Sequence, residues 1–240
     1  MSELLYQKDS YIKEFQCKII KVDDDTNAVI IDKTAFYPGG GGQLCDRGTI
    51  EIREKNYHIN KVKKVGNEIF HYIDGDLPEV GEVCNCIIDW EYRYKLMRTH
   101  TAMHILCGVV WRDYKAQVTG GNMEALSGRM DFEFENLDKD LIVDIEKKIN
   151  EEVNNNRNIK VSILSREEAF NIPDLIRTKI NLLPEGINEI RTVEIEGLDL
   201  QADGGTHVKN TEEVGKIKIV KYKSKGKINK RVYIEIEDKE

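Results

Sequence analysis

The sequence lacks any apolar run that approaches the roughly 20 residues needed by a membrane-spanning helix. Its N-terminus, MSELLYQKDS, has no basic segment followed by an apolar stretch, so no signal peptide is visible. It also has no internal repeat and no low-complexity segment. The five cysteines are odd in number and form no regular framework, which is typical of reduced thiols. These absences predict a cytoplasmic protein that does not associate with membranes.

Positive charge is in the minority, and it is unevenly spread. The net charge of −7 argues against a protein that coats nucleic acid without specificity. Between Lys209 and Arg231, however, a run of lysines faces only Glu212 and Glu213. Two interpretations stay open. In the first, the lysines line the solvent-exposed face and the edge of amphipathic strands, where they prevent aggregation. In the second, they form a surface that contacts phosphates.

The 240 residues are enough for two modest domains, and the chain shows two styles of sequence. Residues 1–89 contain short alternating segments such as CKIIKV, AVIID, GTIEIR, YHINKV, EIFHYI and EVCNCIID, bounded by turn residues. This pattern predicts a small, glycine-rich domain resembling a β-barrel. In the pair Cys84 and Cys86, both side chains face one side of a strand, and buried thiols are favoured over a second metal site.

Residues 90–240 mix helices and strands. The segment WEYRYKLMRTHTAMHILCGVVW predicts a long helix. A second helix is predicted from Asp138 as N-cap and from an apolar stripe of Leu141, Ile142, Ile145, Ile149 and Val153. Strand-like pieces lie between and after these helices: GRMDFEF, KVSIL, IRTVEIE, KIKIVKY and RVYIEIE. The whole chain therefore belongs to the α+β class, with an antiparallel sheet and helices in its second domain.

Two histidine motifs suggest metal chemistry. His100 and His104 are four residues apart on the first predicted helix, so both imidazoles can reach one ion. The motif lacks the glutamate of HExxH proteases. The second motif joins Asp203 to His207 through Gly-Gly-Thr, and its glycines permit a tight turn. Each motif alone has an ordinary structural explanation. Together they supply four zinc-type ligands from separate elements.

A glycine-rich stretch, TAFYPGGGGQ, runs from Thr34 to Gln43. It is not a phosphate P-loop, because no GK[ST] follows. Successive glycines allow backbone amides to approach a ligand closely. A flexible hairpin connection explains the glycines alone, whereas the surrounding polar residues favour a substrate-facing loop. The candidate substrate-binding residues are Thr34, Gly40, Gly41, Gly42 and Gln43.

Taken together, these residues resemble the alanyl-tRNA editing proteins, the free-standing relatives of the editing domain of alanyl-tRNA synthetase. The resemblance rests on three motifs in the same order, TAFYPGGGGQLCDRG, MRTHTAMHIL and LDLQADGGTHVKNTEEVG, and it covers nearly the whole chain. SGRMDF and the IRTV segment around Arg191 also fall in the expected order. The resemblance implies a glycine-rich β-domain over residues 1–89 and a zinc-dependent editing domain over residues 90–240.

The resemblance further implies a function and a ligand set. The expected activity is ATP-independent hydrolysis in trans of Ser-tRNA(Ala), with the glycylated tRNA as a second substrate. No stable protein partner is expected. His100, His104 and His207 correspond to the family's zinc ligands. Many relatives carry cysteine at the position of Asp203, so this aspartate is expected either to bind zinc through oxygen or to orient a ligand.

Selectivity for serine over alanine needs a polar group that only serine satisfies. Thr34 is the candidate for that contact, and Gln43 is a weaker one. Two alternatives belong to other classes of protein. One is a zinc-dependent esterase or amidase acting on small molecules. The other is an RNA-binding module with a structural zinc ion held by four closed ligands.

Overall fold

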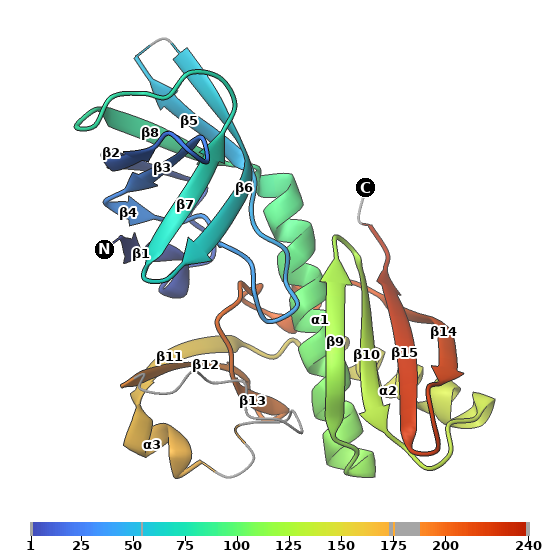
Figure 1. Cartoon of the computed structure of the whole chain (residues 1–240). Helices are drawn as coiled ribbons and strands as arrows, with labels where there is room; N and C mark the ends of the chain where they lie inside the picture. The colour runs from blue at the N-terminus through green and yellow to red at the C-terminus, as the bar shows by residue number, and fades with distance from the viewer. Residues whose placement is uncertain (1, 54, 173–174, 176–187, 239–240) are drawn as a thin grey trace. The chain divides into compact units, whose positions relative to one another are not determined.

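The structure is a computed structural model that describes residues 2–53, 55–172, 175 and 188–238 (Figure 1). It confirms the α+β class, with a closed barrel, antiparallel sheets and helices. The chain divides into two compact units, residues 1–95 and 96–240. This division falls inside helix α1 (Trp90–Tyr114), whereas the style of the sequence changes after Asp89.

The first unit contains a barrel of six strands, drawn in colours from blue to green in Figure 1. Around the barrel they follow the order β2 (Glu14–Asp23), β3 (Ala28–Ile31), β7 (Glu68–Ile73), β6 (Lys55–Val65), β5 (Gly48–Ile52) and β8 (Val83–Ile88). Alternation explains the interior, because Phe15, Cys17 and Ile19 are buried while the residues between them are exposed. The strands expected in this part of the sequence are therefore present.

Two strands of two residues each come before β2 and after β3 in the sequence. β1 (Glu3–Leu4) pairs in parallel with β4 (Lys33–Thr34), and the short 3-10 helix η1 (Leu5–Gln7) follows β1. The pattern of the sequence did not predict these strands, because two residues are too few to show alternation. Their position matters because β4 leads directly into the glycine-rich stretch.

The second unit contains a four-stranded antiparallel sheet in the order β14 (Ile217–Ser224), β15 (Asn229–Ile236), β10 (Ser127–Glu133) and β9 (Val118–Glu124). Helix α1 lies very close to this sheet at Gly128. A Cβ atom there would lie 2.9 Å from Sδ of Met103, so only glycine permits this approach. β9 was not expected, because its VTGGNME sequence has a weak strand signal.

Helix α2 (Lys139–Asn154) begins where the sequence predicts. The side chain of Asp138 accepts a hydrogen bond from the amide of Leu141 at 2.9 Å, which confirms Asp138 as the N-cap. The apolar stripe is also confirmed, since Ile142, Ile145, Ile149 and Val153 are buried and Leu141 is half-buried. Among the described residues, no helix combines the length and apolar character needed to cross a membrane.

The remaining elements of the second unit form a three-stranded antiparallel sheet in the order β11 (Ile159–Ser165), β12 (Glu189–Ile195) and β13 (Asp199–Ala202). Helix α3 (Arg166–Phe170) follows β11, and the 3-10 helix η2 (Thr211–Val214) precedes β14. The loop between β13 and η2 contains the second histidine motif. The first histidine motif lies within α1, so the fold of this unit brings the two motifs into one place.

Candidate metal centre

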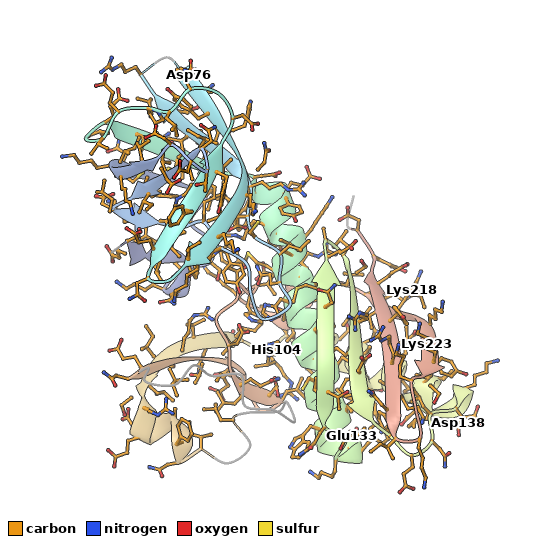
Figure 2. The ribbon with its side chains drawn as sticks, in the orientation of Figure 1. Asp76, His104, Glu133, Asp138, Lys218 and Lys223 are labelled. Atoms are coloured by element: carbon orange, nitrogen blue, oxygen red, sulfur yellow. The ribbon has the colours of Figure 1, made fainter. Side chains whose placement is uncertain are left out.

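Four side chains with metal-ligating atoms converge in the second unit. His100 and His104 project from successive turns of α1, with ring centroids 5.0 Å apart. Figure 2 labels His104 beside this helix. His207 packs against both, with its ring centroid 4.1 Å from that of His100 and 4.8 Å from that of His104. Together with Asp203, their ligand atoms all lie within 4.8 Å of one another. The structure thus brings together the four residues predicted as metal ligands.

The Asp203 carboxylate faces two of the imidazoles. Its Oδ2 lies 3.0 Å from Nε2 of His207, and its Oδ1 lies 3.5 Å from Nε2 of His100. The turn itself holds this carboxylate, because the amide of Gly205 donates to Oδ2 at 2.8 Å. Arg191, on β12, donates from Nη1 to the backbone carbonyl of Asp203 at 2.8 Å. Its side chain therefore anchors the start of the histidine-bearing loop.

A buried aspartate fixes the orientation of His104. Nδ1 of His104 lies 3.1 Å from Oδ2 of Asp199, whose side chain is fully buried. An ionised carboxylate only accepts hydrogen bonds, so Nδ1 carries the proton. In the neutral imidazole Nε2 then keeps its lone pair, and it is the nitrogen available to a metal. A carboxylate behind a histidine is a usual feature of metal sites.

Thr101 is the corresponding partner of His207. Its Oγ1 lies 3.1 Å from Nδ1 of His207 and also accepts a hydrogen bond from the amide of Val208 at 3.4 Å. Because this contact occupies Nδ1, Nε2 of His207 is the atom directed at Asp203. Sequence reasoning did not identify Thr101 or Asp199 as parts of the site. Their signal was only proximity, since Thr101 lies between the two helix histidines and Asp199 precedes the DGGTH motif.

Gly108 explains how Asp199 reaches the helix. It lies on α1 one turn after His104, where the chain between β12 and β13 approaches the helix backbone. A Cβ atom at Gly108 would lie 2.9 Å from Cγ of Leu198 and 3.1 Å from Cβ of Asp199. A larger residue would push Asp199 away, so this glycine permits the contact with His104.

Electrostatics place most of these groups in the protonation states that metal binding requires. Burial lowers the pKa of His207 to about 4 and holds the pKa of His100 well below its usual value. Burial acts in the same direction on His104, but the hydrogen bond to Asp199 and the negative charges of Asp199 and Asp203 together outweigh burial and raise the pKa of His104. Burial alone would raise the pKa of Asp203, yet the neighbouring imidazoles keep it well below the usual value.

The donor set fits a zinc ion. Three imidazoles and one carboxylate are ligand types that zinc prefers, and the three imidazoles alone match the protein ligands of a catalytic site, whose fourth position the carboxylate can yield to water or substrate. The cluster is sheltered, since the side chains of His100, His104, His207 and Asp203 are 5%, 9%, 1% and 13% exposed. The carboxylates of Asp203 and Asp199 offset most of the charge of a divalent cation, and part of the Asp203 charge is shared with Arg191, whose Nη1 lies 3.6 Å from Oδ2. A buried charge without such compensation is costly.

Thr34, a predicted substrate-binding residue, lies in the first unit. Its side chain is fully buried, with Oγ1 2.9 Å from Nε2 of His71 and the amide of Phe36 donating to it at 3.1 Å. Nδ1 of His71 lies 3.2 Å from the carbonyl of Val29, so Nδ1 carries the proton. Burial lowers the pKa of His71 to about 4, and the hydroxyl of Thr34 therefore donates to Nε2. One acceptor position of that hydroxyl remains.

The glycine-rich stretch forms a tight turn in the same unit. The backbones of Gly40 and Gln43 exchange two hydrogen bonds of 3.1 and 2.9 Å. Gly41 and Gly42, between them, have φ values of +57° and +92°, a conformation that strongly favours glycine. A Cβ atom at Gly41 would meet no atom within 4 Å. The tip of the turn therefore consists of backbone atoms alone.

A second group of ligand-type residues lies inside the barrel. Cys17 on β2 has its Sγ 3.0 Å from that of Cys84 and 3.3 Å from that of Cys86, both on β8. All three thiols are buried, as expected for the pair on β8. Cys17 was not connected with them from the sequence. It lies directly opposite Cys84 in the antiparallel pairing of β2 and β8.

Two families of known proteins match parts of this chain. The family described as "Threonyl and Alanyl tRNA synthetase second additional domain" matches residues 190–233, which include Arg191, Asp203 and His207. The family described as "tRNA synthetases class II (A)" matches residues 7–92. Both matches are to families named for aminoacyl-tRNA synthetases, and each covers part of the chain.

Similar full-length proteins narrow the match to one family. The chain is 44% identical over 238 residues to the alanyl-tRNA editing protein AlaX-M of Saccharolobus solfataricus, covering 97% of this chain and 98% of that protein. It is 38% identical over 245 residues to AlaX-M of Methanosarcina barkeri, covering 99% and 100%. The alanine–tRNA ligase of Ignicoccus hospitalis is 38% identical over 222 residues, which are 90% of this chain and 24% of the ligase. The chain belongs to the alanyl-tRNA editing protein family.

Proposed function

We propose that this protein hydrolyses the aminoacyl ester of mischarged tRNA(Ala), with Ser-tRNA(Ala) as the main substrate and the glycylated form as the second. The carrying observation is the convergence of His100, His104, Asp203 and His207 in a member of the alanyl-tRNA editing family. The substrate comes from the family resemblance. The chemistry comes from the donor set, because an aminoacyl ester is an activated ester suited to metal-assisted hydrolysis.

Zinc is the proposed cofactor, held by the three histidines and by Asp203. Zinc in such a site supplies Lewis acidity, which polarises an ester carbonyl and makes water more acidic. The chain itself supplies orientation. Asp199 holds His104 in one tautomer, Thr101 occupies Nδ1 of His207, and Arg191 anchors the backbone carbonyl of Asp203. Ligands held in this way need little reorganisation when substrate arrives.

The selectivity of the enzyme is assigned to Thr34 and the glycine turn. A pocket cannot exclude alanine by size, because alanine is smaller than serine. Discrimination therefore needs a polar group that is left unpaired by alanine. Thr34 is proposed to accept a hydrogen bond from the hydroxyl of serine through its remaining acceptor position. Its hydroxyl donates to His71 and is fully buried, so this contact requires neighbouring residues to move aside. Gln43, Gly40, Gly41 and Gly42 are proposed to contact the aminoacyl group through the turn.

The decisive experiment measures deacylation of Ser-tRNA(Ala) and Ala-tRNA(Ala) by the purified protein, with and without a metal chelator. We expect rapid loss of serine, slow loss of alanine, and loss of activity on chelation that zinc restores. Turnover of small esters without turnover of tRNA would support the small-molecule esterase instead. Stoichiometric zinc without any turnover would support the RNA-binding module with a structural ion.

Replacing Thr34 by valine tests the selectivity assignment. Valine keeps the shape and strand propensity but removes the hydroxyl. The serine-to-alanine ratio of deacylation rates should narrow by about 5- to 150-fold, which corresponds to roughly 1–3 kcal/mol for an unpaired polar group. Zinc content should not change. Because Thr34 also bonds His71, Ile59→Val is the matched control: it weakens the barrel core without removing a hydroxyl. An unchanged ratio in Thr34→Val would place serine recognition elsewhere.

A further inference from the structure

The hairpin formed by β14 and β15 concentrates positive charge in a protein that is acidic as a whole. Residues 216–231 contain seven lysines, Arg231 and no aspartate or glutamate, whereas the chain carries a net charge of −7. Figure 2 labels Lys218 and Lys223 along this hairpin. β14 is the edge strand of its sheet, and among the described residues it pairs with no strand except β15. Helix α2 covers the first part of its outer edge, where Asn150 and Glu146 accept hydrogen bonds from the amides of Ile217 and Ile219.

A β-bulge aligns the lysines of β14. Lys218 lies opposite Glu235, and Lys221 and Lys223 lie opposite Tyr233 and Arg231. Residues 231, 233 and 235 alternate with buried positions of β15, so they share its outer face. Without the register shift between Ile219 and Lys221, strict alternation would turn Lys221 and Lys223 toward the inner face. The bulge instead places both on the outer face with Lys218.

Some of the seven lysines contact other groups of the protein, and the others are available to a ligand. Lys216 and Lys218 pair with Glu237 at 3.7 and 2.6 Å. Lys230 is buried, and its Nζ donates to two backbone carbonyls of the turn at 3.0 and 2.8 Å. The remaining lysines are exposed and form no ion pair among the described residues: Lys221, Lys223, Lys225 and Lys227.

Several carboxylates lie near the hairpin: Glu235 is opposite Lys218, and Glu146 on α2 accepts a hydrogen bond from the amide of Ile219. Asp131 on the neighbouring strand is neutralised by Arg231, with distances of 2.5 and 2.7 Å between the carboxylate oxygens and the guanidinium. Tyr233 lies between the two lysines of β14, with Nζ of Lys221 5.8 Å and Nζ of Lys223 5.5 Å from its ring centroid. The ring therefore attracts both ammonium groups through cation–π interactions on the outer face of the hairpin.

We propose that the β14–β15 hairpin binds the phosphate backbone of tRNA through Lys221 and Lys223 on the outer face of β14 and through Lys225 and Lys227 in the turn that follows. Alternate residues on a strand are about 7 Å apart, which suits successive phosphates along one RNA strand. Lysines at an edge also protect against aggregation, but that role needs no shared face. The naming of tRNA as the ligand rests on the proposed function, whereas the charge and geometry of the surface do not.

The test compares two sets of lysines that carry equal charge. Lys221, Lys223 and Lys225 are replaced by alanine in one variant. Lys61, Lys63 and Lys64, all exposed on β6 of the barrel, are replaced in the matched control. Binding of uncharged tRNA(Ala) is measured by fluorescence anisotropy over a range of salt concentrations. Circular dichroism and zinc content check that both variants are folded.

We expect the hairpin variant to bind about tenfold or more weakly and to lose about 2–3 from the slope of log affinity against log salt, since each phosphate contact contributes roughly 0.7–0.9. The β6 variant should keep most of the affinity and the slope. Equal losses in both variants would show a general effect of net charge and overturn the proposal. Wild-type affinity in the hairpin variant would also overturn it.

A second readout separates this proposal from the proposed function. Hydrolysis of a seryl ester of adenosine, which contains the ester but no tRNA backbone, should be unchanged in the hairpin variant, whereas KM for Ser-tRNA(Ala) should rise. If wild-type protein binds tRNA through the hairpin but removes no serine, the proposed function fails and the surface stands. If serine is removed normally and the hairpin variant binds tRNA normally, the surface fails and the function stands.

Discussion

The two units each bury a group of metal-ligating side chains, and their surroundings differ. In the second unit, the histidines meet Asp203 and are supported by Asp199 and Thr101. In the barrel, Cys17, Cys84 and Cys86 are packed among apolar side chains such as Phe15 and Ile50. Among the described residues, the thiols have as hydrogen-bond partners one another and the carbonyl of Cys17.

The difference shows that convergence of ligand atoms does not by itself make a metal site. A divalent ion brings charge, and the histidine cluster compensates that charge with two carboxylates. The thiols must first lose protons, and contact with neighbouring thiols together with burial raises the pKa of Cys86 and of Cys17. The same thiol contacts lower the pKa of Cys84 to about 4, so the cluster favours one thiolate rather than three. Three thiolates in an apolar barrel would also carry uncompensated charge. We therefore assign zinc to the histidine cluster and a packing role to the cysteines.

Removing a histidine of the metal cluster should have the largest effect on zinc content and activity. We expect about one zinc ion per chain in the wild-type protein and loss of zinc or activity in His100→Ala and in His207→Ala. The loss of activity should exceed the roughly 10–100-fold typical of outer-shell changes, because a direct ligand is removed. Elemental analysis and deacylation assays measure the two quantities. Full zinc occupancy with full turnover in the double variant would rule out the site.

Substitutions of Asp203 should have the next largest effect. If its carboxylate is a ligand, Asp203→Ala weakens zinc affinity, whereas Asp203→Cys retains zinc through a thiolate. A competitive chelator titration compares the three proteins. Should the alanine variant bind zinc as tightly as the wild type, Asp203 would instead orient a ligand, as its 3.0 Å contact with His207 permits.

Asp199→Asn removes charge behind His104 while keeping the shape of the side chain. The amide can still accept a hydrogen bond from Nδ1, but it no longer balances a divalent ion. We expect a loss of 10- to 100-fold in zinc affinity or activity, smaller than the loss of a histidine. The matched control is Gln201→Leu, which removes the 2.6 Å hydrogen bond to Asp199 but leaves the carboxylate in place. Equal effects in both variants would indicate packing rather than charge.

The sequence predicted the strongly periodic elements well, and the four candidate ligands that it suggested lie close together in the structure. The apolar stripe of α2, its N-cap Asp138 and the alternation in the barrel strands were all visible, because local spacing determines them. The two histidine motifs were linked by the chemistry of zinc and by the family resemblance. Short or glycine-rich strands, including β9 and β1, gave too weak a periodic signal.

Partners from distant segments were not predictable in the same way. Asp199 reaches His104 only because Gly108 lets the chain approach α1, and nothing in the local sequence specifies that contact. Cys17 meets Cys84 through the register of two strands that are far apart in the chain. The hydrogen bond between Thr34 and His71 likewise forms only when the strands close into a barrel. Such contacts are properties of the tertiary fold.

The smallest effect is expected from Cys86→Ala in the barrel. This residue is fully buried and contacts Cys17 at 3.3 Å, so truncation leaves a small cavity and should lower the free energy of unfolding by about 1 kcal/mol. Zinc content and deacylation of Ser-tRNA(Ala) should stay unchanged, because the thiol holds no metal. Denaturant unfolding and elemental analysis measure these quantities, and Ile50→Val, which trims a neighbouring part of the same core, is the control. If the wild type held two ions and Cys86→Ala only one, the thiols would form a second metal site. The contrast between the two clusters would then fail, since an apolar surrounding would be no obstacle to binding an ion.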